Sequence, residues 1–109
     1  MANLLAWLEE MAEGEEIEAV VIGEMGWGDY GRDGVPDYTE MPKGIVINWD
    51  EAKKWLGYEF YSGFGAPGCN AVYAWTATRV IAISQYDGST EPFSIPRNPT
   101  AIMPEMPGG

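Results

Sequence analysis

Residues 79–95 read RVIAISQYDGSTEPFSI, two runs with the character of strands on either side of the pair Asp87-Gly88. An Asp-Gly pair favours the tight turn that joins two antiparallel strands. The stretch therefore predicts a β-hairpin. Pro92, in the second run, has no N–H group to donate, so we expect this second strand at the edge of its sheet.

Further strands are expected on the N-terminal side of this hairpin. Residues 16–22 begin with alternating Glu and Ile and become wholly apolar, as in a strand that enters a core. A short buried strand is expected at 44–48. We expect the rest of the sheet to be a β meander, with strands at 59–62, 70–76, 79–85 and 90–95.

Two helices are expected beside these strands. Residues 2–12 carry apolar residues at helical spacing, and Gly14 follows as a natural stop. Asn48 with Glu51 three residues later forms a capping-box pattern that starts a second helix, and Gly57 ends it. The predicted fold class is α+β, with two helices packed on an antiparallel sheet of about four to five strands.

Two segments read as irregular. Residues 23–44 are rich in glycine and hold two prolines, which predicts a long irregular loop of the kind that is often functional. The four prolines after residue 95 predict an extended C-terminal segment. We find no repeat or linker that divides the chain, so we expect a single domain over 1–109, globular over 1–100 with an extended tail at 101–109.

The chain is strongly acidic, with 17 Asp and Glu, 6 Lys and Arg, no His and a formal net charge of −11. Such a charge repels phosphate backbones, so nucleic acid is not an expected partner. The acidity is explained by solubility, by a basic protein partner, or by mimicry of nucleic-acid charge. Five Trp and six Tyr exceed what a small core needs and favour a contact surface.

The expected location is the cytoplasm. A lone cysteine, Cys69, cannot form an intrachain disulfide, and this fits a reducing compartment. No apolar run approaches the roughly 18 residues of a membrane span, so no membrane association is expected. The N-terminus lacks the basic and apolar segments of a signal peptide.

Enzymatic activity is not expected. Without His, the Ser-His and Cys-His arrangements for nucleophilic catalysis are unavailable, and a single Cys cannot complete a zinc site. Cys69 has no nearby basic residue in sequence to lower its pKa, so a small apolar filler is the better interpretation. Neither glycine-rich segment has the spacing of a phosphate loop. No cofactor is expected.

One local pattern is typical of a calcium loop. The twelve residues from 29 to 40, DYGRDGVPDYTE, match the template at five positions: Asp29, Asp33, Gly34, Asp37 and Glu40. The third position is Gly31 and lacks a ligand, and nearby prolines oppose the flanking helices that the motif requires. A solvated acidic loop is therefore favoured over a metal site.

The basic residues point instead to binding. Arg97 and Asn98 stand between two prolines, and Arg79 begins a strand. A guanidinium offers a rigid fork of donors for carboxylate or phosphate, and flanking prolines reduce the freedom that binding must remove. Phe64 and Tyr86 are candidate aromatic faces for stacking a base. The alternative for Arg97 is an ordinary surface ion pair with one of the many carboxylates.

The order of WDEA, GFG, AWT, YDG and PRNP across residues 49–99 resembles small bacteriophage proteins of the Thoeris anti-defence family. The resemblance implies a non-enzymatic homo-oligomer that sequesters cyclic nucleotide signals, including cyclic ADP-ribose isomers, in pockets built partly between subunits. It further implies that Arg97 and Asn98 contact phosphate or ribose, with Phe64 or Tyr86 under the base. The acidity departs from this pattern, because an anion-binding protein must concentrate its few cations in one pocket.

The expected function is therefore capture of a cyclic nucleotide-type immune signal by a phage protein in the host cytoplasm. The alternative is an acidic inhibitor that mimics nucleic-acid charge and blocks a basic bacterial defence protein. A protein of the second kind needs charge and no pocket.

Overall fold

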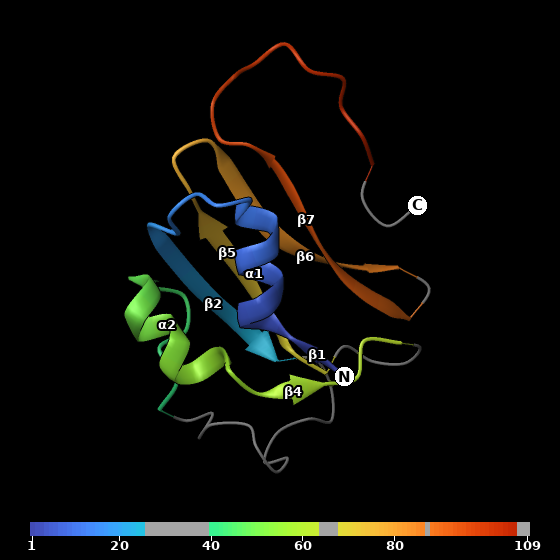
Figure 1. Cartoon of the computed structure of the whole chain (residues 1–109). Coiled ribbons are helices and arrows are strands. Elements are labelled where there is room, and N and C mark those ends of the chain that lie inside the picture. The colour runs from blue at the N-terminus through green and yellow to red at the C-terminus, as the bar shows by residue number, and fades with distance from the viewer. Residues whose placement is uncertain (26–39, 64–67, 87, 107–109) are drawn as a thin grey trace.

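The computed structural model describes residues 1–25, 40–63, 68–86 and 88–106. Two helices pack on one face of an antiparallel five-stranded sheet, and a second sheet of two strands lies beside them (Figure 1). The predicted α+β class is confirmed. None of the helices in the described ranges is long and apolar enough to cross a membrane.

The main sheet has the strand order β3-β2-β5-β6-β7, and all its neighbours are antiparallel. Its strands are β2 (Ala19–Met25), β3 (Val46–Ile47), β5 (Asn70–Trp75), β6 (Arg79–Tyr86) and β7 (Ser89–Pro96). The hairpin of β6 and β7 is confirmed, with Gly88 in a left-handed conformation at φ +81°. β7 is an edge strand, as Pro92 predicted.

The small sheet was not predicted. It pairs β1 (Ala2–Asn3) with β4 (Glu59–Phe60). Helix α1 (Leu4–Ala12) therefore starts two residues later than expected, because Asn3 is its cap and accepts from the N–H groups of Leu5 and Ala6. The expectation that 59–62 belongs to the meander is wrong, since β4 pairs with the N-terminus instead of the main sheet.

Two strand boundaries also differ from the prediction. The strand expected at 16–22 begins at Ala19 and continues to Met25, into the segment expected to be irregular. The strand expected at 44–48 shrinks to Val46–Ile47. Gly44 explains the second difference, because it adopts φ +75° and turns its N–H to the carbonyl of Ile22, outside the ladder of β3.

Helix α2 (Trp49–Leu56) begins and ends where the sequence places it. Asn48 caps it, with Oδ1 accepting from the N–H of Glu51 at 2.8 Å. The Glu51 carboxylate, which the predicted capping box would turn back to Asn48, accepts instead from Lys54 and Trp55. Gly57 follows as the C-cap.

The core lies between the helices and the inner face of the main sheet. Helix α1 contributes Leu4 and Leu8, and α2 contributes Leu56, all fully buried. The sheet adds Val20, Ile22, Val72, Ala74 and Ile81. Burial of such side chains contributes about 1.5–3 kcal/mol each, so this layer is the main source of stability.

One polar cluster is buried at the margin of this core. Asn70 is fully buried, and its Oδ1 accepts from the hydroxyl of Tyr58 at 2.6 Å, while its backbone N–H donates to the same hydroxyl at 2.9 Å. Its Nδ2 donates to the carbonyl of Gly23 at 2.9 Å. The cluster ties β2 and β5 to the segment after α2, and each buried polar group in it has a partner.

Candidate functional site

A groove of about 780 Å³ lies between the end of β7 and the C-terminal segment. Figure 1 shows this segment arching away from the end of β7 before it turns back. The groove is lined by Arg79, Phe93, Ile95, Arg97 and Asn98, and by segment residues between 99 and 106. Three of the five ligand-binding residues predicted from the sequence, Arg79, Arg97 and Asn98, therefore share one groove.

Arg97 is held on the wall of this groove by three hydrogen bonds. Its backbone N–H donates to the carbonyl of Thr78 at 2.9 Å. Its Nη1 donates to Oε1 of Glu18 and to the carbonyl of Thr76, both at 2.8 Å. The expected surface ion pair thus exists, with the Arg97 side chain 40% exposed. Among the described residues, Nε and Nη2 have no protein partner, so part of the fork can still donate.

Arg79 is held in a similar way at the start of β6. Its backbone N–H donates to Oγ1 of Thr76 at 3.0 Å, and its Nε donates to Oγ of Ser94 at 2.8 Å. No residue in the described part of the chain accepts from its two terminal nitrogens. Arg79 is opposite Pro96 in the ladder, which is why the two arginines lie at the same end of the hairpin.

The turn between β5 and β6 is anchored by a carboxylate. Glu15 accepts from the hydroxyl of Thr76 at 2.5 Å, and from the hydroxyl of Thr78 at 2.8 Å and 2.7 Å. These donors, Thr76 first and Thr78 second, lower the pKa of the Glu15 carboxyl, and the charge of Arg79 acts in the same direction. Glu15 thereby fixes the turn that holds Thr76 and Thr78. Arg79 follows this turn in the chain, and Arg97 donates to the Thr76 and Thr78 carbonyls.

Acid is expected to weaken this anchor. Because the pKa of Glu15 is lower in the folded chain than its ordinary value of 4.5, the carboxylate stabilises the fold above that value. The contribution is lost as the pH falls through the lowered, folded pKa. Glu15→Gln should therefore flatten the acid limb of a plot of urea midpoint against pH. Glu16→Gln removes a neighbouring exposed charge, and a profile as flat as that of Glu15→Gln would contradict the anchor.

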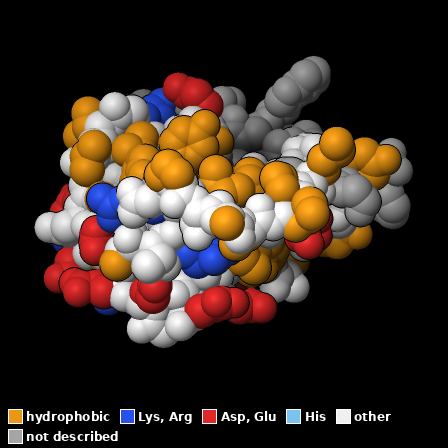
Figure 2. Space-filling model, turned by 90° about the horizontal axis from the view of Figure 1, so that it is seen from above, with side chains coloured by type: hydrophobic (Ala, Val, Ile, Leu, Met, Phe, Trp, Pro, Cys, Tyr) orange, Lys and Arg blue, Asp and Glu red, His pale blue; other side chains and the backbone are white. Residues whose placement is uncertain are grey.

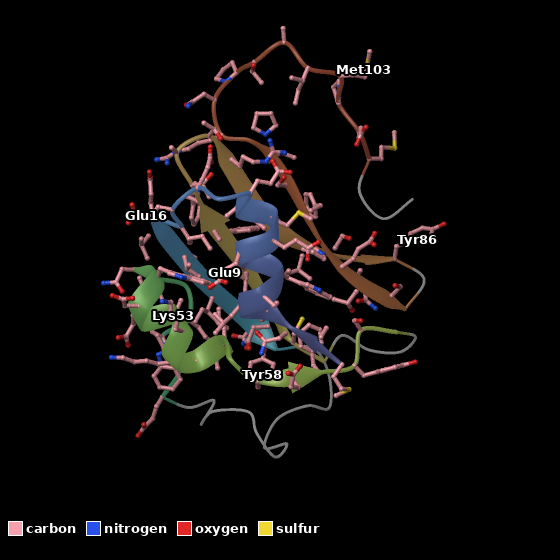
Figure 3. The ribbon with its side chains drawn as sticks, in the orientation of Figure 1. Glu9, Glu16, Lys53, Tyr58, Tyr86 and Met103 are labelled. Atoms are coloured by element: carbon pink, nitrogen blue, oxygen red, sulfur yellow. The ribbon has the colours of Figure 1, made fainter. Side chains whose placement is uncertain are left out.

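The other predicted site residues do not line the groove or lie outside the described residues. Tyr86 is the last residue of β6, 62% exposed at the hairpin end, and Figure 3 shows it pointing away from the body of the protein. Phe64 lies outside the described ranges. The aromatic residue that does line the groove is Phe93, which sequence reasoning missed. Its alternation with Ile95 along β7 is the signal that could have found it.

The candidate calcium loop lies mostly outside the described residues. Asp29, Asp33 and Asp37 lie outside the described residues, whereas Glu40 is described and exposed. Within the described ranges, no group of three or more His, Cys, Asp or Glu side chains could hold a metal ion. Cys69 is buried, in agreement with its interpretation as a small filler.

The groove can offer a ligand two kinds of contact. Arg79, Arg97 and Asn98 supply N–H donors, and Phe93 and Ile95 supply apolar surface. Glu105 also lines it and opposes an anion, as does Glu18 beside Arg97. No protein-family model, curated protein or solved structure matches the chain.

Proposed function

We propose that this chain is a non-enzymatic binding protein that captures an anionic, nucleotide-like small molecule in the groove. The observation that carries the proposal is the pair of oriented guanidinium groups, Arg79 and Arg97, on one groove with N–H donors still available. The resemblance to Thoeris anti-defence proteins makes the expected ligand a cyclic nucleotide-type immune signal. The expected setting is then a phage homo-oligomer in the host cytoplasm.

The dimensions of the groove support a ligand of this class. Small-molecule sites usually measure about 300–1,000 Å³ and combine apolar walls with a few polar groups. A phosphate would accept from the guanidinium forks, and the ring of Phe93 would contact a base. Pro96 and Pro99 stiffen the backbone around Arg97 and Asn98, which lowers the entropy that binding must remove.

The distribution of cations supports the same site. The three lysines lie elsewhere and pair with acidic neighbours: Lys43 with Glu24, Lys53 with Asp50 and Lys54 with Glu51. Both arginines of the described ranges line the groove. An acidic chain that is to hold an anion must gather its cations in this way, because every exposed carboxylate nearby opposes binding.

Arg97→Ala is expected to weaken capture of a cyclic nucleotide strongly, because it removes the donor fork. A phosphate contact by Arg contributes about 1.5–3 kcal/mol, which is roughly tenfold to a hundredfold in affinity. Native mass spectrometry with a panel of cyclic nucleotides, with thermal shift alongside, measures both capture and oligomer mass.

Glu18→Gln is the matched control for Arg97→Ala. It breaks the same ion pair but keeps the guanidinium, and it removes a carboxylate that competes with the ligand. It should bind at least as tightly as the unmodified chain. If both variants bind normally, Arg97 is only a surface ion pair. If the unmodified chain captures nothing from the panel, the proposed ligand class is wrong.

A second candidate function rests on the acidic side of the molecule. Glu9, Glu10, Glu13 and Glu16 are all exposed on α1 and the turn that follows it. In Figure 3, Glu9 lies on α1, and Glu16 lies to the left, beside the start of β2. Such a surface suits a basic bacterial defence protein. A partner bound there would be released as salt rises, and the chain would gain no thermal stability from nucleotides.

A further inference from the structure

The face of the main sheet that points away from the helices is apolar. A shallow depression of about 330 Å³ on it is lined by Tyr73, Trp75, Val80, Ala82, Phe93 and Ile95, which we call the outer face. The register places Trp75 opposite Val80, and Val80 opposite Ile95, so these side chains form a continuous row. Val21 and Val46 extend the apolar surface to the other edge of the sheet.

The outer face is unlike an ordinary solvated sheet surface. Antiparallel sheets with one wet face alternate apolar and polar residues, whereas here both faces are apolar. Tyr73 is 58% exposed, Ile95 50% and Val46 72%. None of the six outer-face residues is charged, in a chain with a net charge of −11. The register places one exposed carboxylate, Glu91, on the same side of β7, next to Phe93 at the margin of this face. Exposed apolar patches of this kind mark interaction sites.

The edge of the sheet at β7 offers a poor alternative for association. The N–H of Thr90 points away from β6 and donates to the carbonyl of Ser62 at 3.0 Å. Alternate residues of a strand present their backbone N and C=O groups to the same side. Pro92, Ser94 and Pro96 therefore also present these groups to the side away from β6. Two of these are prolines. In the described part of β7, only Ser94 keeps an N–H for an added strand, so contact through the face is favoured.

We propose that a second copy of this chain docks on the outer face, sheet against sheet about a two-fold axis. A two-fold contact needs only one patch, because each copy presents the same surface to the other. The six uncharged side chains offer little attraction to a charged partner, but they let two acidic copies meet with only Glu91 at the margin of the contact. Phe93 and Ile95 line both the groove and the outer face, but the proposal does not rest on the proposed ligand, and its test contains none.

The positions of the charges fit this arrangement. Helix α1 lies in front of the sheet in Figure 1, and that side is at the bottom of Figure 2. Figure 2 shows most acidic side chains along the bottom of the view and a band of hydrophobic side chains along the top. Two copies joined through the outer face would keep most of their carboxylates on the outside of the dimer, where water and salt screen them.

The area of the outer face sets the expected strength of the dimer. Strands about 4.8 Å apart, with outward side chains about 6.8 Å apart, give about 33 Å² for each side chain. The six outer-face residues therefore cover about 200 Å², and about 260 Å² together with Val21 and Val46. A stable interface buries about 800 Å² per partner. Phe93 and Ile95 also line the groove, so the apolar surface continues to the exposed Ile102 and Met103 of the C-terminal segment. We expect a weak dimer that forms in a concentration-dependent way.

The test is sedimentation equilibrium of the full chain from micromolar to millimolar concentration. Tyr73→Lys and Ile95→Lys each place a charge in the contact and should weaken dimerisation about tenfold or more. Both side chains are half-exposed, so the monomer should stay folded, as circular dichroism would verify. Tyr61→Lys is the matched control, because Tyr61 is 63% exposed outside the main sheet and should leave dimerisation unchanged.

Two further comparisons identify the surface that is used. Added salt should strengthen a dimer of acidic copies joined by an apolar face, since it screens their repulsion. Ser94→Pro removes the remaining outward donor of β7 and should leave the dimer intact. A chain that stays monomeric at every concentration overturns the proposal. So does a dimer that survives Tyr73→Lys and Ile95→Lys, or one that only Ser94→Pro dissolves.

Discussion

Asn70→Ala is expected to lower the free energy of unfolding by about 3–5 kcal/mol. Asn70 is fully buried, and its amide satisfies the Tyr58 hydroxyl and the Gly23 carbonyl. Alanine would leave these groups without that partner in a space that water does not fill freely. Each buried group left unsatisfied costs about 1–3 kcal/mol, and the cavity adds to this. Urea unfolding followed by Trp fluorescence measures the change.

Asn98→Ala is the matched control, because it makes the same substitution at an exposed position. It should change stability by no more than about 0.5 kcal/mol. Tyr58→Phe removes the other partner and should cost about 1–3 kcal/mol. The double variant should lose less than the sum of the two, since both act on one network. Strict additivity would show that the two side chains do not stabilise the fold through each other.

Phe60→Ala is expected to cost about 3–5 kcal/mol, which lowers the melting temperature by about 12 °C or more. Phe60 is fully buried in β4, with its ring edge-to-face on Trp7 at a centroid distance of 5.2 Å. Since β4 has only two residues, its ladder to β1 is short, and Phe60 is the side chain that joins this small sheet to the core. Differential scanning calorimetry gives the shift.

Tyr61→Ala tests whether the effect of Phe60→Ala comes from burial. Tyr61 is the next residue but is 63% exposed, so its truncation should change stability by about 0.5 kcal/mol or less. Phe60→Leu keeps most of the apolar volume and should fall between the two. If Phe60→Ala melted within a degree or two of the unmodified chain, the small sheet would not contribute to the cooperative core.

The parts of the fold that sequence reasoning found are those with local causes. Asp87-Gly88 specifies its turn, Pro92 marks its edge strand, and Asn48 caps α2 through its own side chain. The pairing of β1 with β4 has no such signal. Two residues are too few to show a period of two, and their partners are separated by more than fifty positions in the chain.

Which predicted residues share the groove could be foreseen only in part, for a similar reason. The prolines around residues 97–98 identified a stiff basic segment, and the hairpin then brings Arg79 beside it. Tyr86 lies far from the groove, because Arg79 and Tyr86 stand at opposite ends of the same eight-residue strand, about 24 Å apart. Glu15 and Glu18, which hold the arginines and their turn, were missed since only the folded chain brings them to residues 76–97.

The prolines of β7 have a consequence for how much of this protein a cell can hold. A protein that captures a ligand without converting it must be as abundant as the ligand, because each copy removes only what it can hold. At high abundance, an open sheet edge is a template on which further chains add without limit. With two of its outward positions occupied by proline, β7 cannot propagate such growth. The proposed contact through the outer face would close after one partner, so crowded copies would stop at a finite assembly.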